Sequence, residues 1–187
     1  MTNIFNIALT GFLVFSGMST PSDSASSFIE LPSNESKIEI SSVRLTGYNA
    51  VAEQTNSEPH ITASGVRSNP HVVIARSRDM ADILPYGTIV ALDVPAESRE
   101  CGFSKVSQFV GYRVVSDTMH KRKMRQMDVL FATHDSISLG EREVNPATAM
   151  GVCEANVRVV GHVSLEKIPK TQQELVWLVE GKQLSMK

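Results

Sequence analysis

The sequence predicts an all-β fold, a single barrel with one or two short helices. Its apolar residues gather in short runs rich in Val, Ile and aromatic side chains, and turn-forming residues separate the runs. The runs are four to seven residues long, which is typical of strands and too short for helices. With 187 residues, 42% of them apolar, the chain can bury one sizeable core but has little room for a second domain.

Six segments are expected to be strands because each is short, apolar or alternating, and bounded by turn residues. In chain order they are residues 38–40 continuing into 43–48, then 72–75, 88–94, 109–115, 129–132 and 157–163. Six or so short strands with few helices indicate a compact all-β barrel.

Helical signals are fewer. Residues 79–84 predict one or two turns that end before Pro85. In residues 145–151, Asn145 is a suitable N-cap, Pro146 stands at the first helical position, and a glycine ends the segment. Residues 171–184 place three apolar side chains on one face, which predicts a C-terminal helix.

The chain divides into four parts by composition. Residues 1–25 predict a secretory signal, because an apolar stretch too short to span a membrane precedes small residues suited to cleavage. The signal lacks a basic N-terminal region, and a disordered N-terminus is the alternative. Residues 26–37 predict a Ser-rich linker, 38–168 the barrel, and 169–187 a helical tail.

The charge distribution argues against nucleic-acid binding. Eighteen basic and twenty acidic residues give a net charge of −2, which offers no bulk attraction for phosphates. Three of the acids lie in residues 1–36, which contain no Lys or Arg, so the remaining chain carries about +1. The densest basic run is residues 120–125, where the alternatives are a solvated loop and a rim that contacts an anionic ligand.

The cysteines and histidines do not indicate a metal site. Cys101 and Cys153 allow two interpretations: a disulfide in an oxidising compartment, or two small buried hydrophobes in a reducing one. Neither has a second Cys at C-x-x-C spacing, and the five histidines lack zinc-site spacings. Neither the nucleophile motif G-x-S-x-G nor a Gly-rich phosphate loop occurs, and no cofactor is expected.

Three aspartates are the candidate catalytic groups. Asp79, Asp117 and Asp128 each adjoin an apolar strand, where partial burial would raise the pKa of a carboxyl group. The alternative is structural, because aspartates at strand ends often cap turns.

Six short motifs around these aspartates occur in one order along the chain. They are residues 45–49 (LTGYN), 61–65 (ITASG), 77–79 (SRD), 84–88 (LPYGT), 116–119 (SDTM) and 127–129 (MDV). Together they resemble the three-aspartate (3D) domain of bacterial envelope proteins, found in stationary-phase survival proteins and, in diverged form, in membrane-bound lytic transglycosylase A. The resemblance runs from about residue 43 to residue 163, and Asp117 and Asp128 have the family's separation of eleven residues.

The resemblance implies a six-stranded double-psi β-barrel that cleaves the MurNAc–GlcNAc bond of peptidoglycan. By position, Asp128 resembles the family's catalytic acid/base, Asp117 its supporting carboxylate, and Asp79 the first of the three. One family variant carries a lysine six residues after the second aspartate, where this chain has Lys123. In that variant the loop is glycine-rich, whereas here residues 119 and 120 are Met and His, which predicts a bulkier loop.

Further residues in these motifs and in the basic run are candidates for substrate binding, with turn formation or packing as the alternative. They are Tyr48, Thr62, Ser64, Thr118, Lys121 and Lys123.

The family's reaction suits a single acid/base. In a lytic transglycosylase the C6 hydroxyl of the sugar attacks C1, so one carboxyl group can protonate the leaving oxygen and later accept the hydroxyl proton. Such a group must begin protonated, and a nearby ionised Asp117 would raise the pKa of Asp128.

Two functions remain open from the sequence. The first is an exported enzyme of the periplasm or cell envelope that acts on peptidoglycan glycan strands. The second is a non-catalytic barrel that binds wall glycan or an envelope protein. Residues 138–145 are expected to be a solvated loop, with a lid or partner contact as the alternative, and no pattern indicates an oligomeric state.

Overall fold

The computed structural model describes residues 38–55, 58–95 and 101–181. The predicted signal (residues 1–25) and linker (residues 26–37) lie outside the described residues, as do residues 182–187 of the predicted tail. No helix among the described residues is long and apolar enough to span a bilayer.

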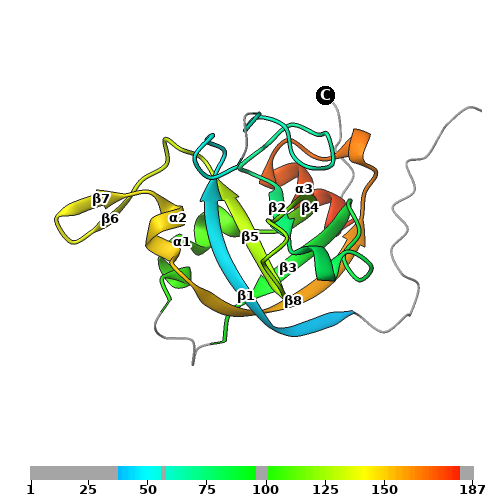
Figure 1. Cartoon of the computed structure of the whole chain (residues 1–187), viewed down its shortest axis with the longest axis horizontal. Helices are drawn as coiled ribbons and strands as arrows, with labels where there is room; N and C mark the ends of the chain where they lie inside the picture. The colour runs from blue at the N-terminus through cyan, green and yellow to red at the C-terminus, as the bar shows by residue number, and fades with distance from the viewer. Residues whose placement is uncertain (1–37, 56–57, 96–100, 182–187) are drawn as a thin grey trace, which may run out of the picture.

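The described chain forms a closed six-stranded β-barrel, which confirms the predicted fold class (Figure 1). The strands are β1 (Glu39–Asn49), β2 (Val73–Arg76), β3 (Thr88–Asp93), β4 (Arg113–Thr118), β5 (Gln126–Phe131) and β8 (Cys153–His162). Their order around the barrel is β1-β5-β2-β4-β3-β8. β1 pairs with β5, and β2 with β4, in parallel, while the other four pairs are antiparallel. Strands far apart in the chain therefore lie side by side and bring distant residues together.

The predicted strand at residues 109–115 is wrong in its first half. Helix α1 (Phe103–Val110) occupies this part, and β4 begins only at Arg113. Val106 and Val110 lie four positions apart, so both reach the core from one helical face. Gly111 then reverses the chain with a φ of +54°, a left-handed value that favours glycine.

The other predicted helices form with shorter bounds. Helix α2 (Pro146–Met150) has the expected cap, because the Asn145 side chain accepts a hydrogen bond from the amide of Ala147 at 2.9 Å. Helix α3 (Gln172–Val179) begins after its N-cap, Thr171, and ends before residue 184. The expected turns at residues 79–84 contain a 3₁₀ turn, η1 (Arg78–Met80), and a second 3₁₀ turn, η2 (Leu165–Lys167), precedes α3.

The loop predicted at residues 138–145 is instead a β-hairpin that projects from the body of the protein (Figure 1). β6 (Ile137–Leu139) pairs with β7 (Arg142–Val144), and Gly140 supplies the positive φ of the turn at +65°. The Glu143 carboxylate accepts hydrogen bonds from the hydroxyls of Ser136 and Ser138, which join the two strands at their exposed side.

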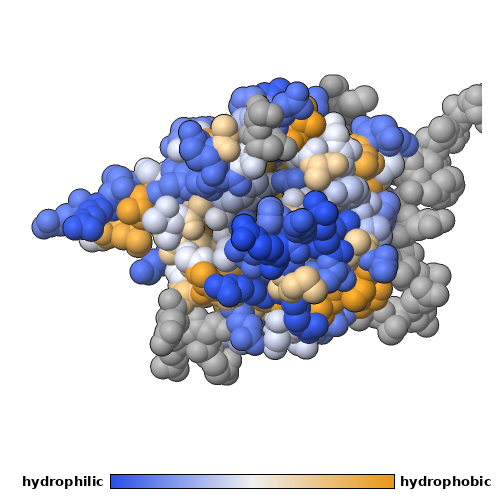
Figure 2. All heavy atoms as spheres, in the orientation of Figure 1, coloured by the Kyte–Doolittle hydropathy of each residue, from blue (hydrophilic) through white to orange (hydrophobic). Residues whose placement is uncertain are grey.

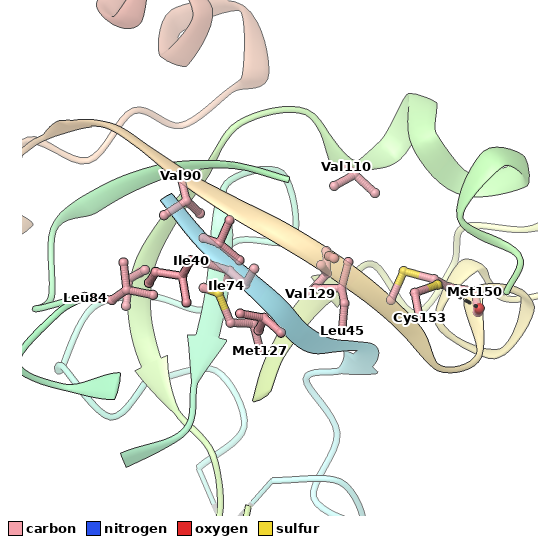
Figure 3. Packing of buried hydrophobic residues seen from close by; sticks show 14 of the residues in the cluster. Ile40, Leu45, Ile74, Leu84, Val90, Val110, Met127, Val129, Met150 and Cys153 are labelled. Atoms are coloured by element: carbon pink, nitrogen blue, oxygen red, sulfur yellow. Dashed lines mark hydrogen bonds between the residues drawn. The ribbon is translucent and has the colours of Figure 1, made fainter. Parts of the chain in front are cut away.

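Two apolar layers lie on opposite sides of the barrel wall. Alternate residues of all six strands, such as Leu45, Ile74 and Val129, fill the interior and continue under α1 and α2 (Figure 3). Their neighbours, including Val73 and Leu130, form an outer layer with Leu175 of α3. A residue's position along a strand therefore decides whether it enters the core or faces outward.

A disulfide joins Cys101 to Cys153, with 5.1 Å between the two Cα atoms. It connects the segment just before α1 to the first residue of β8. Of the two interpretations that the sequence allows, the structure has the bonded one.

Arg113 is fully buried and bonds to backbone carbonyls instead of a carboxylate. Its guanidinium donates to the carbonyl oxygens of Pro70, Val73, Phe109, Val110 and Leu130. Burial lowers the pKa of Arg113 to about 9, while interaction with Tyr48 partly opposes this. One side chain thus connects the end of α1 to the segment around β2 and to β5.

Replacing Arg113 should therefore destabilise the fold. Arg113→Met leaves five carbonyl oxygens without this donor, so we expect the free energy of unfolding to fall by about 3 kcal/mol or more in urea titrations. Arg113→Lys keeps a buried cation with three donors and should lose less. The control is Arg158→Met on the exposed side of β8, and a loss for Arg113→Met as small as that of the control would contradict this role.

Candidate active site

Four residues align across four neighbouring strands and form the floor of the candidate site. Asp128 of β5 pairs with Thr46 of β1 on one side and with Ala75 of β2 on the other. Ala75 also pairs with Asp117 of β4. The two aspartates are thus separated by a single strand, roughly 10 Å between backbones. Ala75 has only a methyl group, so the space between the two carboxyl groups stays open.

A one-residue β-bulge turns Asp117 toward this side of the sheet. Ile74 pairs with Val115 inside the barrel, but the next residue of β2, Ala75, pairs with Asp117, which leaves Ser116 as the extra residue. Strict alternation after Val115 would have directed Asp117 into the apolar interior. The bulge instead buries Ser116, whose hydroxyl has no hydrogen-bond partner among the described residues.

Asp128 is partly buried and keeps its proton to a higher pH than a free aspartic acid does. Burial raises its pKa to about 6, and the negative charge of Asp117 adds a smaller increase. Two interactions oppose this: the Thr46 hydroxyl donates to Oδ1 at 2.8 Å, and Lys123 contributes a positive charge. Gln126 donates to the Thr46 hydroxyl oxygen at 3.0 Å and so directs the hydroxyl proton toward Asp128.

Asp117 has a different environment, because hydrogen-bond donors occupy both of its carboxylate oxygens. The Tyr48 hydroxyl donates to Oδ2 at 2.7 Å. The backbone amides of Ala63 and Thr118 donate to Oδ1 at 2.9 and 2.8 Å. Burial and the charge of Asp117 raise the pKa of Tyr48, so the phenol keeps the proton that it donates. Asp117 is therefore oriented as a fixed negative charge.

Both carboxyl groups line a groove with a volume of about 450 Å³. Its walls also contain Tyr48, Gln54, Thr55, Pro59, Ile61, Ala63, Ser68, Ala75, Arg78, Thr118, Met119, His120 and Lys123. Two cavities of larger volume, about 590 and 560 Å³, have no acidic residue in their walls. Of these three spaces, the groove at Asp128 is the one that combines carboxyl groups with room for a substrate.

The structure brings together five of the residues that the sequence suggests. Asp117, Asp128, Tyr48, Thr118 and Lys123 all line the groove.

Three candidates for substrate binding lie elsewhere. The Thr62 hydroxyl contacts the Ser64 hydroxyl and the Val66 carbonyl oxygen, both at 3.1 Å. Both side chains therefore stabilise the turn that carries the Ala63 amide to Asp117. Lys121 is exposed and does not line the groove.

Asp79 does not lie with the other two aspartates in the groove. It is exposed, and its carboxylate accepts a hydrogen bond from the Arg125 amide at 2.9 Å. Desolvation opposes ionisation, but hydrogen bonds from Ser77 and Arg125 lower the pKa of Asp79. This location suits a residue that holds the loop at residues 120–125 in place. It suits less well a catalytic carboxylate, which is the role that the resemblance suggests.

Several residues in or beside the groove were not predicted from the sequence. Thr46, which bonds to Asp128, lies inside one of the motifs and two positions before Tyr48, so strand alternation offered a signal for it. Arg78 lies inside the motif at residues 77–79, whereas Gln54 carries no comparable signal. His120 was predicted only as a member of the basic run and as a bulky residue of the loop. Among the described residues, no group of three His, Cys, Asp or Glu side chains could hold a metal ion.

Comparison with models of known protein families finds no match, and no curated protein is significantly similar to this chain.

The raised pKa of Asp128 predicts a pH-dependent difference in stability. In the folded protein this pKa is about 6, against 3.8 for a free side chain, so the native state holds the extra proton between these values. Stability from this group is therefore present at low pH and lost as the pH rises from about 4 to 6. Asp128→Asn removes that loss and should exceed the wild type in stability at pH 7 by up to about 3 kcal/mol.

The measurement is urea unfolding of both proteins at pH 4 and pH 7. Asn can still accept the hydrogen bond from Thr46, so the local geometry is preserved. The control is Asp82→Asn, at an exposed aspartate outside the groove. If the two variants differ from the wild type by the same amount at both pH values, Asp128 is not the buried acid described here.

Proposed function

We propose that the protein is a lytic-transglycosylase-like enzyme that cleaves the MurNAc–GlcNAc bond of peptidoglycan, with Asp128 as its one acid/base. The observation that carries the proposal is the Asp128 carboxyl group, which lines an open groove and has a pKa raised to about 6 by burial. An acid of this pKa is partly protonated at the pH where such an enzyme works. The ordered motifs that resemble the 3D domain support the same assignment.

In the proposed reaction, protonated Asp128 donates its proton to the oxygen that links MurNAc to GlcNAc. The bond from that oxygen to C1 breaks, and positive charge develops on the MurNAc ring. The C6 hydroxyl of the same sugar then attacks C1, and its proton returns to Asp128. The products are a 1,6-anhydro-MurNAc end and a free GlcNAc hydroxyl, with no water consumed.

The hydrogen bonding of Asp117 favours this one-carboxylate mechanism over hydrolysis. A hydrolase commonly needs a second carboxylate that is free to attack the sugar or to activate water. Both oxygens of Asp117 are instead occupied by three donors. A fixed charge in this position raises the pKa of Asp128 and stabilises positive charge on the sugar.

Basic side chains around the groove suit an anionic glycan. Arg78, His120 and Lys123 line it, and Lys121 and Arg122 are exposed in the same loop. Figure 2 shows strongly hydrophilic residues gathered at the centre of the face that it presents, over the barrel strands. The lactyl and peptide carboxylates of peptidoglycan would be attracted to such a surface.

The disulfide and the predicted signal support export to the periplasm or cell envelope. Disulfides persist mainly in oxidising compartments outside the cytosol. The Cys101–Cys153 bond is thus compatible with the compartment that holds the proposed substrate.

A non-catalytic glycan-binding barrel is the second candidate. The observation in its favour is the loop after β4, where Met119 and His120 stand at positions that are glycine in one variant of the resembling family. Both residues line the groove, where their side chains take space that glycine would leave open.

Incubation with purified sacculi, followed by mass analysis of the soluble products, separates these functions. We expect products that are one water lighter per end, and a loss of at least about 100-fold in release for Asp128→Asn. Asp82→Asn is the control and should cleave like the wild type. Products with intact reducing ends would indicate a hydrolase, and binding without release would indicate the non-catalytic barrel; either result contradicts the proposal.

The pH profile gives a second test. Because the reaction begins with protonated Asp128, activity should fall as the pH rises above about 6. The charge of Lys123 lowers the pKa of Asp128, so Lys123→Met should move this decline to higher pH. Lys121→Met, in the same loop but outside the groove, is the matched control and should leave the decline in place. An equal shift for both variants would contradict the assignment.

A further inference from the structure

A second cavity, with a volume of about 560 Å³, adjoins the groove at Asp128. Ser68 lines both, so the cavity and the groove meet at this small side chain. We propose that the second cavity binds the peptide arm that peptidoglycan carries on its lactyl group. The inference rests on the proposed function, and it assigns to the protein a preference for peptide-bearing strands.

The charges of the cavity are complementary to such a peptide. Arg67, His71 and Lys170 line it, and none of its lining residues is acidic. All three basic side chains are exposed, which leaves their donor groups open to a ligand. The peptide arm carries carboxylates on its side chains and at its C-terminus, which these donors can bind.

The apolar part of the lining fits the rest of a short peptide. It consists of Val66, Pro70, Val73, Leu165, Ile168 and Pro169. Peptide arms contain alanine, whose methyl group can pack on a wall of this kind. A cavity with a mostly apolar wall and a few charged groups is the usual form of a small-ligand site.

Hydrogen bonds hold the walls of the cavity in place. The Asn69 side chain donates to the Lys170 carbonyl oxygen at 2.8 Å and accepts from the His71 amide at 3.0 Å. Gln172 of α3 donates to the His71 carbonyl oxygen at 2.5 Å. Two segments about 100 residues apart in the chain are thus joined across the cavity. A preformed site of this kind loses little entropy when a ligand binds.

The position relative to Asp128 agrees with the covalent structure of the substrate. The sugar that the proposed reaction attacks is the same sugar that carries the peptide. When its C1 lies at Asp128, the lactyl group must leave the groove nearby, and the boundary at Ser68 offers an exit toward Arg67 and Lys170.

The test measures binding separately from cleavage. In the Asp128→Asn background, calorimetry with a soluble GlcNAc–MurNAc-peptide is compared with the same disaccharide lacking the peptide. Arg67→Ala with Lys170→Ala should weaken binding of the peptide-bearing ligand by about tenfold and leave the bare disaccharide unchanged. Lys167→Ala, an exposed lysine three residues from Lys170 and outside the cavity, is the matched control and should change neither.

Each outcome bears on one proposal. Equal loss for both ligands would mean that the cavity binds the sugars that both ligands share, and no loss for either would mean that the cavity is not a ligand site; both overturn the inference. The two proposals can also fail separately. If binding depends on the peptide, Arg67 and Lys170 but the wild type releases no anhydro product from sacculi, the inference is supported and only the proposed cleavage is rejected. Circular dichroism of each variant confirms that it is folded.

Discussion

The candidate site depends on one constraint, the register that places Thr46, Asp128, Ala75 and Asp117 in a row across β1, β5, β2 and β4. No two neighbours in this row come from strands that follow one another in the chain. It requires the parallel β1–β5 and β2–β4 pairs, and barrel closure holds all four strands at fixed spacing. The bulge at Ser116 completes it, because only the extra residue directs Asp117 to the side of Asp128. A slip of one residue at any of these pairs would break the row, because the shifted strand would turn its side chain to the other face of the sheet.

The two groove aspartates acquire different chemistry from their surroundings alone. Burial dominates at Asp128 and raises its pKa, and the opposing effects of Thr46 and Lys123 do not outweigh it. Three donors surround Asp117 and hold it as a fixed charge. Environments that separate two carboxyl groups in this way are typical of acid/base pairs in enzymes. Keeping an acid partly buried opposes folding near neutral pH, which is a common property of functional sites.

Much of the barrel could be predicted from the sequence, because runs of Val and Ile of strand length are a local signal. The strand predicted at residues 109–115 was wrong in its first half because Phe109 and Val110 are apolar but belong to α1. The buried residues of this helix, Val106 and Val110, lie four positions apart, which is helical spacing and not the alternation of a strand. The aspartates and Tyr48 could be found from ordered motifs, whereas the bulge at Ser116 and the contact of Asp128 with Thr46 arise from tertiary pairing. The disulfide could not be decided either, since two cysteines 52 residues apart fit both interpretations.

Asp79 shows how a third aspartate can serve the site without lying in it. Its carboxylate binds the amide of Arg125, a residue held at a φ of +47°, where the loop after β4 turns into β5. At the other end of the loop, the Met119 amide donates to the Arg76 carbonyl oxygen at 2.9 Å. With both ends attached to the barrel, the loop keeps Lys123 at the groove, where its charge lowers the pKa of Asp128. Asp79 therefore contributes to the site by holding the end of the loop that carries Lys123, and not by contact with a substrate in the groove.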